Sequence, residues 1–145
     1  TVIIFICNHC PYVKHVNPQL TAIGNHYLTK GVKIIAISSN DAAAQPDDAP
    51  DNMKQVAEQE KYPFPYLYDE TQQVAKAYDA ACTPDFYIFD KELKLVYRGQ
   101  LDDSRPGNKT PLTGSDMRKA LDSLLQGQPI SPYQRPSIGC NIKWK

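Results

Sequence analysis

The first seven residues, TVIIFIC, constrain the fold of this 145-residue chain more than any other segment. A continuous run of apolar, mostly β-branched residues is typical of a strand that is buried on both faces, as in a parallel or mixed sheet. Such a strand seldom opens a protein with nothing before it. Since no initiator Met and no signal peptide precede it either, we expect further residues upstream in the natural chain.

Helical and extended patterns then alternate along the chain. Apolar residues recur at three- and four-residue steps from Val13 to Tyr27, which predicts a helix ending near Gly31 with a kink at Pro18. Further strands are expected at residues 32–39, 62–69, 84–90 and 94–100, and further helices at 52–61, 69–80 and 115–126. This order predicts an α/β sheet with helices on both faces. We expect one domain at 1–127 and an irregular tail, 128–145, packed on it.

The charge and the cysteine count exclude several functions. The chain has 16 Lys and Arg against 16 Asp and Glu, so it lacks the basic excess with which proteins bind nucleic acids or membrane surfaces. No apolar run is long enough to span a membrane. Four cysteines are too few for a disulfide scaffold in a chain of this length. We therefore expect a cytoplasmic protein whose two neighbouring cysteines carry out chemistry.

The motif Cys7-Asn8-His9-Cys10 lies between the first predicted strand and the first predicted helix. N–H groups at a helix start favour a thiolate, which predicts a lowered pKa for Cys7 and makes Cys7 the nucleophile. The spacing places Cys10 within disulfide reach as the more buried, resolving thiol. An imidazolium at His9 would stabilise the thiolate and make the disulfide a stronger oxidant. This chemistry needs no cofactor beyond the redox-active disulfide itself.

A second motif, Ala81-Cys82-Thr83-Pro84, stands between a predicted helix and a predicted strand. Together with the CxxC motif, it makes the chain resemble the thioredoxin superfamily. In that superfamily a cis-proline faces the CxxC motif, and the residue before the proline offers its backbone to an extended substrate. The resemblance implies a cis bond between Thr83 and Pro84 and a substrate groove shaped by both residues.

The helix and strand expected at 52–69 narrow the resemblance to the redoxin branch, which contains peroxiredoxins and thiol-disulfide oxidoreductases. The segments CNHCPYVKH and PSIGCNIKWK are similar to those of bacterial peroxiredoxin-like proteins. The resemblance covers essentially the whole chain. It implies a three-layer thioredoxin-like α/β fold with a central mixed sheet, helices on both faces and an extra helix–strand insertion.

The resemblance implies a thiol-disulfide oxidoreductase that exchanges its CxxC pair with a protein or a low-molecular-weight thiol or disulfide, served by a reductant such as thioredoxin or glutathione. One alternative is a thiol peroxidase, in which a hydroperoxide oxidises Cys7 to a sulfenic acid that Cys10 resolves. Arg105 favours this alternative, because it lies in a place comparable to the arginine that holds the thiolate in peroxiredoxins. Ile4 opposes it, because peroxiredoxins have a threonine at that position.

The other alternative is a metal-binding or metallochaperone module in which Cys7, Cys10 and His15 hold copper or zinc. No second CxxC and no HxxxH motif completes such a set, so we assign no metal ligand.

The two remaining cysteines each have two interpretations. Cys82 is either a secondary redox thiol near the pair or a small buried hydrophobe. Cys140 is either a third redox partner or a residue packed beside Trp144. The segment 40–52 is interpreted as a solvated acidic loop with four aspartates, Asp41, Asp47, Asp48 and Asp51.

Overall fold

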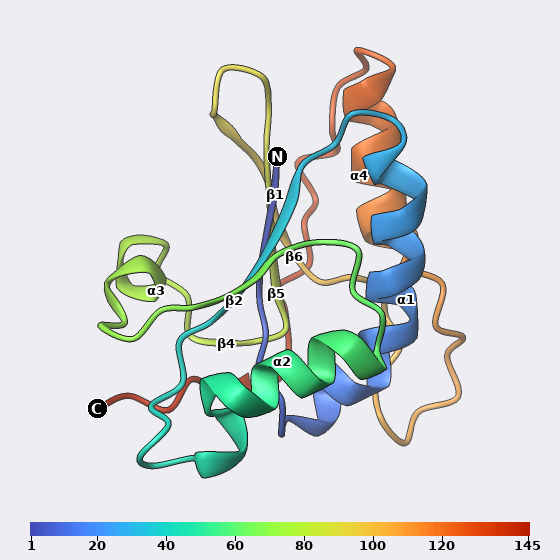
Figure 1. The fold of residues 1–145 in the computed structure, drawn as a ribbon. Helices are drawn as coiled ribbons and strands as arrows, with labels where there is room; N and C mark the ends of the chain where they lie inside the picture. The colour runs from blue at the N-terminus through green and yellow to red at the C-terminus, as the bar shows by residue number, and fades with distance from the viewer.

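The computed structural model describes residues 1–145. Its centre is a mixed β-sheet (Figure 1). Its strands are β1 Val2–Phe5, β2 Ile34–Ser38, β3 Tyr66–Tyr68, β5 Asp85–Phe89 and β6 Leu95–Gly99. They lie in the order β3-β2-β1-β5-β6 across the sheet. β1 is parallel to β2 and β2 is parallel to β3, whereas β5 is antiparallel to both of its neighbours, β1 and β6.

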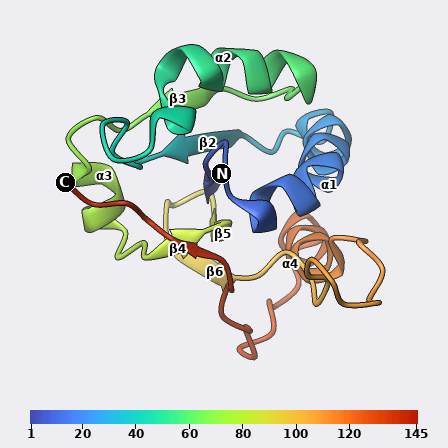
Figure 2. The same cartoon turned by 90° about the horizontal axis from the view of Figure 1, so that it is seen from below.

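The sheet separates two layers of helices. The helices are α1 Pro11–Leu28, α2 Pro50–Gln59, α3 Gln73–Ala77 and α4 Ser115–Leu125. Figure 2 shows α1 and α4 on one side of the sheet and α3 on the other, with α2 alongside the edge strand β3. The predicted arrangement of helices on both faces is therefore confirmed. None of the four helices is both long enough and apolar enough to cross a membrane.

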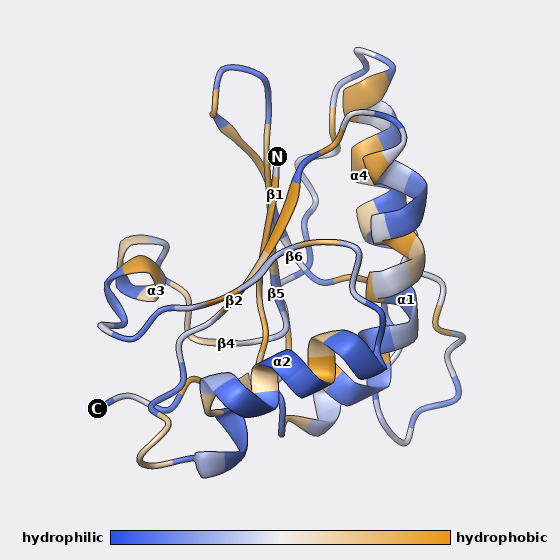
Figure 3. Cartoon of the chain, in the orientation of Figure 1, coloured by the Kyte–Doolittle hydropathy of each residue, from blue (hydrophilic) through white to orange (hydrophobic).

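Strand β1 is buried along its whole length, as the sequence predicts. Its side chains alternate between two cores, because successive residues of a strand point to opposite faces. Ile4 packs in the core beneath α1 and α4, whereas Ile3 and Phe5 pack in a smaller core against α3. Figure 3 shows β1 and β2 as hydrophobic strands at the centre of the molecule, while α2 is hydrophilic along much of its length.

Helix α1 runs through Pro18, which has no N–H to donate to the preceding turn. Figure 2 shows the first turns of α1 at an angle to the rest of the helix, as expected for a proline kink. Pro11 stands at the first helical position, where the missing N–H costs nothing.

Two predicted helices differ from the observed ones. A 3-10 turn, Pro46–Asp48, precedes α2, and α2 itself begins at Pro50, so the predicted acidic loop is partly helical. In place of the helix expected at 69–80, the structure contains α3, which is only five residues long. It begins directly after Gln72, whose φ of 64° lies in the left-handed region. The carboxylate of Asp69 accepts hydrogen bonds from N–H groups of the first helical turn, so Asp69 lies outside the helix that it caps.

The tail, which we expected to be irregular, contains a strand. β7 Cys140–Asn141 pairs antiparallel with β4 Cys82–Thr83, which places Cys140 opposite Thr83. The N–H of the next residue, Ile142, donates to the carbonyl of Ala81 at 3.0 Å, and the Ile142 side chain is buried in the core against α3. The chain segment 140–142 is thus held on the body by both backbone and side-chain contacts.

At Gly139 the tail lies too close to β4 to accommodate a side chain. A Cβ at this position would lie 1.8 Å from the carbonyl oxygen of Thr83 and 3.2 Å from Cδ of Pro84. Because the nearest atom belongs to the backbone, it cannot move aside cheaply.

We therefore expect Gly139→Ala to lower the free energy of unfolding by about 1–3 kcal/mol, since the new methyl group pushes β7 away from β4. Urea unfolding followed by far-UV circular dichroism measures this. Asn141→Ala is the matched control, because the Asn141 side chain is exposed and its truncation should change stability by no more than about 0.5 kcal/mol. Equal stability of both variants and the parent would contradict the close packing of Gly139.

Candidate active site

The CxxC motif forms the turn between β1 and α1, as the sequence predicts. β1 ends at Phe5 and α1 begins at Pro11, so that Cys10 is the residue directly before the helix. All four cysteines are free thiols. Both thiols of the motif are buried, with 1% of Cys7 and 0% of Cys10 exposed.

Thr83 contacts both cysteines of the motif. Its hydroxyl lies 3.5 Å from the Cys7 sulfur, and its carbonyl oxygen accepts a hydrogen bond from the Cys10 thiol at 3.6 Å. The peptide bond between Thr83 and Pro84 is cis, as the resemblance implies. The two motifs, more than 70 residues apart in sequence, therefore meet at one site.

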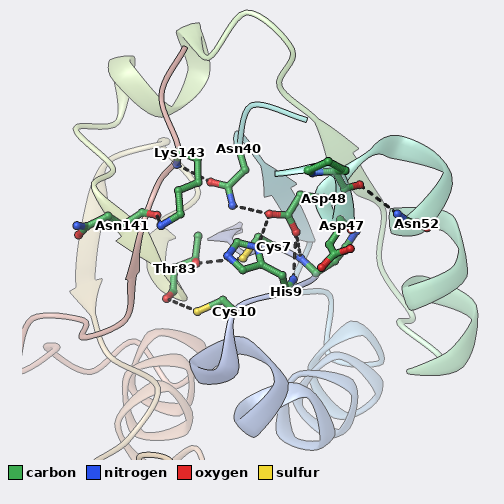
Figure 4. A network of polar contacts seen from close by, with 12 residues as sticks. Cys7, His9, Cys10, Asn40, Asp47, Asp48, Asn52, Thr83, Asn141 and Lys143 are labelled. Atoms are coloured by element: carbon green, nitrogen blue, oxygen red, sulfur yellow. Dashed lines mark hydrogen bonds and ion pairs between the residues drawn. The ribbon is translucent and has the colours of Figure 1, made fainter. Parts of the chain in front are cut away.

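A buried carboxylate fixes the turn between the two cysteines. Asp48 is 0% exposed, and its Oδ1 accepts hydrogen bonds from the backbone N–H groups of Asn8 at 2.7 Å and His9 at 3.1 Å. Its Oδ2 accepts a hydrogen bond from the Asn40 side chain at 2.8 Å and lies 2.5 Å from Nδ1 of His9 (Figure 4). The four contacts use all the acceptor positions of the carboxylate.

The interpretation of the aspartates as a solvated loop is wrong for Asp48. The 3-10 turn directs Asp48 inward and leaves its neighbour Asp47 exposed. Sequence reasoning missed Asp48 because nothing in the dipeptide Asp47-Asp48 distinguishes the buried residue from the exposed one.

Asn8 ties the turn to a third segment. Its Nδ2 donates to the carbonyl of Asp47 at 3.0 Å, and its Oδ1 accepts a hydrogen bond from the hydroxyl of Tyr66, on β3, at 2.9 Å. Burial raises the pKa of Tyr66 well above its usual value, so the phenol keeps the proton that it donates. The insertion of α2 and β3 thus supplies contacts to the CxxC turn.

The two thiols of the motif titrate as a pair. Interaction with the Cys7 thiol is the largest cause that lowers the pKa of Cys10, while burial opposes it. The Cys140 thiol and the backbone N–H groups of Val13 and Cys140 lower the pKa of Cys10 further. In the reduced protein these donors favour a negative charge on Cys10.

Cys7 retains the shared proton. Its pKa is raised because its thiol interacts with the Cys10 sulfur and because it is buried, and the Asp48 carboxylate raises it further. The Thr83 hydroxyl lowers it. This assignment is the reverse of the lowered pKa that we expected for Cys7, because the contact between the two sulfurs leaves the proton on Cys7 and because Cys7 is buried near the Asp48 carboxylate.

His9 does not act as an isolated positive charge beside the dithiol. The Cys7 sulfur, a His9 ring nitrogen and an Asp48 carboxylate oxygen all lie within 4.8 Å of one another. Any positive charge on His9 is therefore offset by the carboxylate that holds its ring. The stronger oxidising power expected from His9 stays a prediction, and Asp48 acts against it.

The set of Cys7, Cys10 and His15, considered as an alternative metal site, does not form. His15 does not join the cysteines, because its Nε2 lies 2.7 Å from the hydroxyl of Ser104. Cys7, His9 and Asp48 carry donor types that zinc accepts, but Asp48 already uses its acceptor positions in hydrogen bonds. Coordination would require this network to break, so the residues present fit a hydrogen-bonded turn better than a metal centre.

Arg105 makes its hydrogen bonds to residues near it in sequence. Its guanidinium donates to the carbonyl oxygens of Asp102 at 2.6 Å and Ser104 at 2.8 Å, and also contacts Oε1 of Gln100. None of these hydrogen bonds reaches Cys7. The hydrogen bonds of Arg105 hold its own loop together, and its place beside a Cys7 thiolate stays a prediction.

The other two cysteines lie on opposite faces of the small β4–β7 sheet. Cys82 contacts the carbonyl oxygen of Ser137 at 3.8 Å, and burial raises the pKa of Cys82 to about 11. Cys140 lies across from Thr83 and interacts with Cys10. The structure thus brings Cys140 to the dithiol and leaves Cys82 on the other face.

Comparison with known proteins agrees with this geometry. A model of the AhpC/TSA family matches residues 1–98. The chain belongs to this family. Among curated proteins, none matches the chain.

Two solved structures share nearly the whole fold. An uncharacterized conserved protein from Geobacillus kaustophilus is 67% identical, with a TM-score of 0.98, over 99% of this chain and 76% of that chain. A hypothetical protein from Sinorhizobium meliloti 1021 is 46% identical, with a TM-score of 0.98, over 99% of this chain and 79% of that chain.

More distant structures establish the fold class. A thioredoxin-like protein in the oxidized form is 19% identical, with a TM-score of 0.68, over 88% of this chain and 78% of that chain. The fold is thioredoxin-like, as the resemblance implies. The redoxin family and this fold together support oxidoreductase chemistry at sulfur.

We expect Asp48→Asn to lower the pKa of Cys7, because it removes a negative charge beside that sulfur while keeping the shape of the side chain. More thiolate stabilises the reduced form, so the reduction potential should rise. Thiolate absorbance near 240 nm during a pH titration, together with a redox titration, measures both effects. Asp47→Asn is the control, since Asp47 is exposed. A Cys7 pKa that is equal in the two variants would contradict the electrostatic role of Asp48.

Proposed function

We propose that this protein is a thiol-disulfide oxidoreductase in which Cys7 and Cys10 exchange electrons with a protein or low-molecular-weight disulfide. The observation that supports this most is the contact of Thr83 with both sulfurs, at 3.5 Å and 3.6 Å. The two sulfurs lie beside one another, with the negative charge favoured on Cys10 and the proton on Cys7. Such a pair can form a disulfide by thiol–disulfide exchange.

The exchange proceeds in two steps. The Cys7 sulfur passes its proton to the Cys10 thiolate and attacks one sulfur of the substrate disulfide. The substrate S–S bond breaks, and one substrate thiolate leaves. Cys10 then loses the proton to that thiolate and attacks the Cys7 sulfur of the mixed disulfide. The Cys7–Cys10 bond forms, and the second substrate thiolate leaves, so the substrate is reduced and the protein is oxidised.

We assign the attack on substrate to Cys7 because Cys10 is enclosed by the Thr83 carbonyl and Cys140. Regeneration then requires an external thiol reductant, such as thioredoxin or glutathione. Peroxide reduction is less well supported, since Arg105 makes its hydrogen bonds within its own loop.

Reduction of insulin disulfides by dithiothreitol tests this proposal. We expect the protein to accelerate the reaction and both Cys7→Ser and Cys10→Ser to reduce the rate to the uncatalysed background. Cys82→Ser is the matched control, because Cys82 contacts Ser137 and not the dithiol, and it should keep the activity.

The rate of oxidation by hydrogen peroxide, measured by stopped flow, separates the two enzymatic alternatives. We expect a rate no greater than that of free cysteine. A fast peroxide reaction without insulin reduction would replace the proposed activity with a thiol peroxidase activity.

A further inference from the structure

The edge of β4 where an extended substrate would pair is filled by the protein's own chain. The resemblance implies that the backbone of Thr83 pairs with a substrate strand. In the structure that backbone pairs with β7, in the register Thr83 opposite Cys140. The segment 139–142 therefore lies as a bound extended peptide would lie, with a cysteine at the position next to the dithiol.

The register determines where the Cys140 side chain points. Residues directly opposite in an antiparallel pair carry their side chains on the same face, with Cβ atoms about 4.5–5.5 Å apart. The Thr83 hydroxyl is on the face that contacts the Cys7 sulfur, so Cys140 projects to that face as well. Cys82 is one residue earlier and projects to the other face, where it contacts Ser137.

The segment is held firmly in this register. The close approach of Gly139 to Thr83 leaves no room for a side chain. Beyond the strand, the N–H of Lys143 donates to the Asn40 side chain at 2.9 Å, and Asn40 in turn donates to Asp48 (Figure 4). Before the strand, the Ser137 hydroxyl donates to Asp85 at 2.7 Å. Anchors on both sides keep Cys140 next to the pair.

We propose that Cys140 is a third redox residue, which exchanges with the Cys7–Cys10 disulfide and carries the disulfide toward the protein surface. The proposal rests on the proposed function, because substrate turnover is what oxidises the pair. Cys140 is partly exposed, whereas both cysteines of the pair are buried, so it is the sulfur that an external reductant reaches more easily.

The step is a thiol–disulfide exchange without net oxidation. The Cys140 sulfur attacks the Cys10 sulfur as its proton is removed, the Cys7–Cys10 bond breaks, and the electron pair leaves on Cys7, which takes up the proton. The products are a Cys10–Cys140 disulfide and a free Cys7 thiol. The external reductant then attacks Cys140 and restores the three thiols.

Oxidation of the pair favours this attack. In the reduced protein, burial and the negatively charged Cys10 raise the pKa of Cys140 to about 11, while the ammonium of Lys143 lowers it. Once Cys10 is part of a disulfide, its charge is gone, and the remaining influences on the Cys140 pKa are burial, which raises it, and Lys143 and the backbone of Tyr12, which lower it. The pKa of Cys140 is therefore lower after turnover, so its thiolate forms more readily when it is needed to attack the disulfide.

Peptide mapping of the oxidised protein tests the proposal. The reduced protein is mixed with oxidised glutathione, quenched with acid, blocked with N-ethylmaleimide and digested with trypsin without reductant. Cys7 and Cys10 both lie in the tryptic peptide 1–14, and Cys140 lies in the peptide 120–143. We expect two products, an internally bonded peptide 1–14 and a cross-linked pair of 1–14 with 120–143.

Variants identify the sulfur that is linked. Cys7→Ser leaves only Cys10 in peptide 1–14, and this variant should still give the cross-link. Cys140→Ser should abolish the cross-link but keep the internal disulfide. Cys82→Ser is the matched control and should give the same two products as the parent.

The outcomes separate this proposal from the proposed function. An internal Cys7–Cys10 disulfide with no cross-link in the parent or in Cys7→Ser would overturn the role of Cys140 and leave the oxidoreductase intact. A parent protein that forms neither disulfide would overturn both.

Discussion

The buried carboxylate of Asp48 is the contact on which the candidate site depends. An ionised group without solvent is costly to bury unless donors surround it, and here two backbone N–H groups, one amide and one imidazole do so. Both backbone donors belong to the turn between the cysteines. The same interactions that make the buried charge tolerable therefore fix the path of the CxxC turn. The 3-10 turn between β2 and α2 carries this carboxylate, so that segment is part of the site.

Thr83 has a complementary role, because it joins three segments that are distant in sequence. Its hydroxyl contacts Cys7, its carbonyl accepts from Cys10, and its backbone pairs with Cys140. A single residue thus contacts both sulfurs of the motif and pairs with the strand that carries Cys140. The charge distribution follows from this arrangement, since Cys10 lies among donors and Cys7 lies near the carboxylate.

Local patterns were enough to predict the parts of the molecule that periodicity and motif spacing determine. The apolar run at Val2 gave the central strand, and the two motifs placed Cys7 and Cys10 opposite Thr83. Three features follow from neither periodicity nor motif spacing and could not be predicted in this way. Asp47 and Asp48 differ in burial only after the 3-10 turn has formed. Arg105 donates its hydrogen bonds to residues of its own loop. Strand β7 has only two residues, too few to show an alternating pattern. The pKa order of the thiols likewise depends on the contact between their sulfurs, on burial and on the Asp48 carboxylate.

The pairing of β4 with β7 also determines when the site becomes complete during synthesis. The dithiol, Asp48 and Thr83 are all made before residues 139–142, so β4 can pair with β7 only after the rest of the site has been synthesised. While the ribosome still holds that segment, the Thr83 edge is open and the CxxC pair lacks the strand that packs beside it. A nascent chain therefore presents its CxxC pair beside an open strand edge, whereas the finished protein presents the pair beside an edge that β7 already occupies.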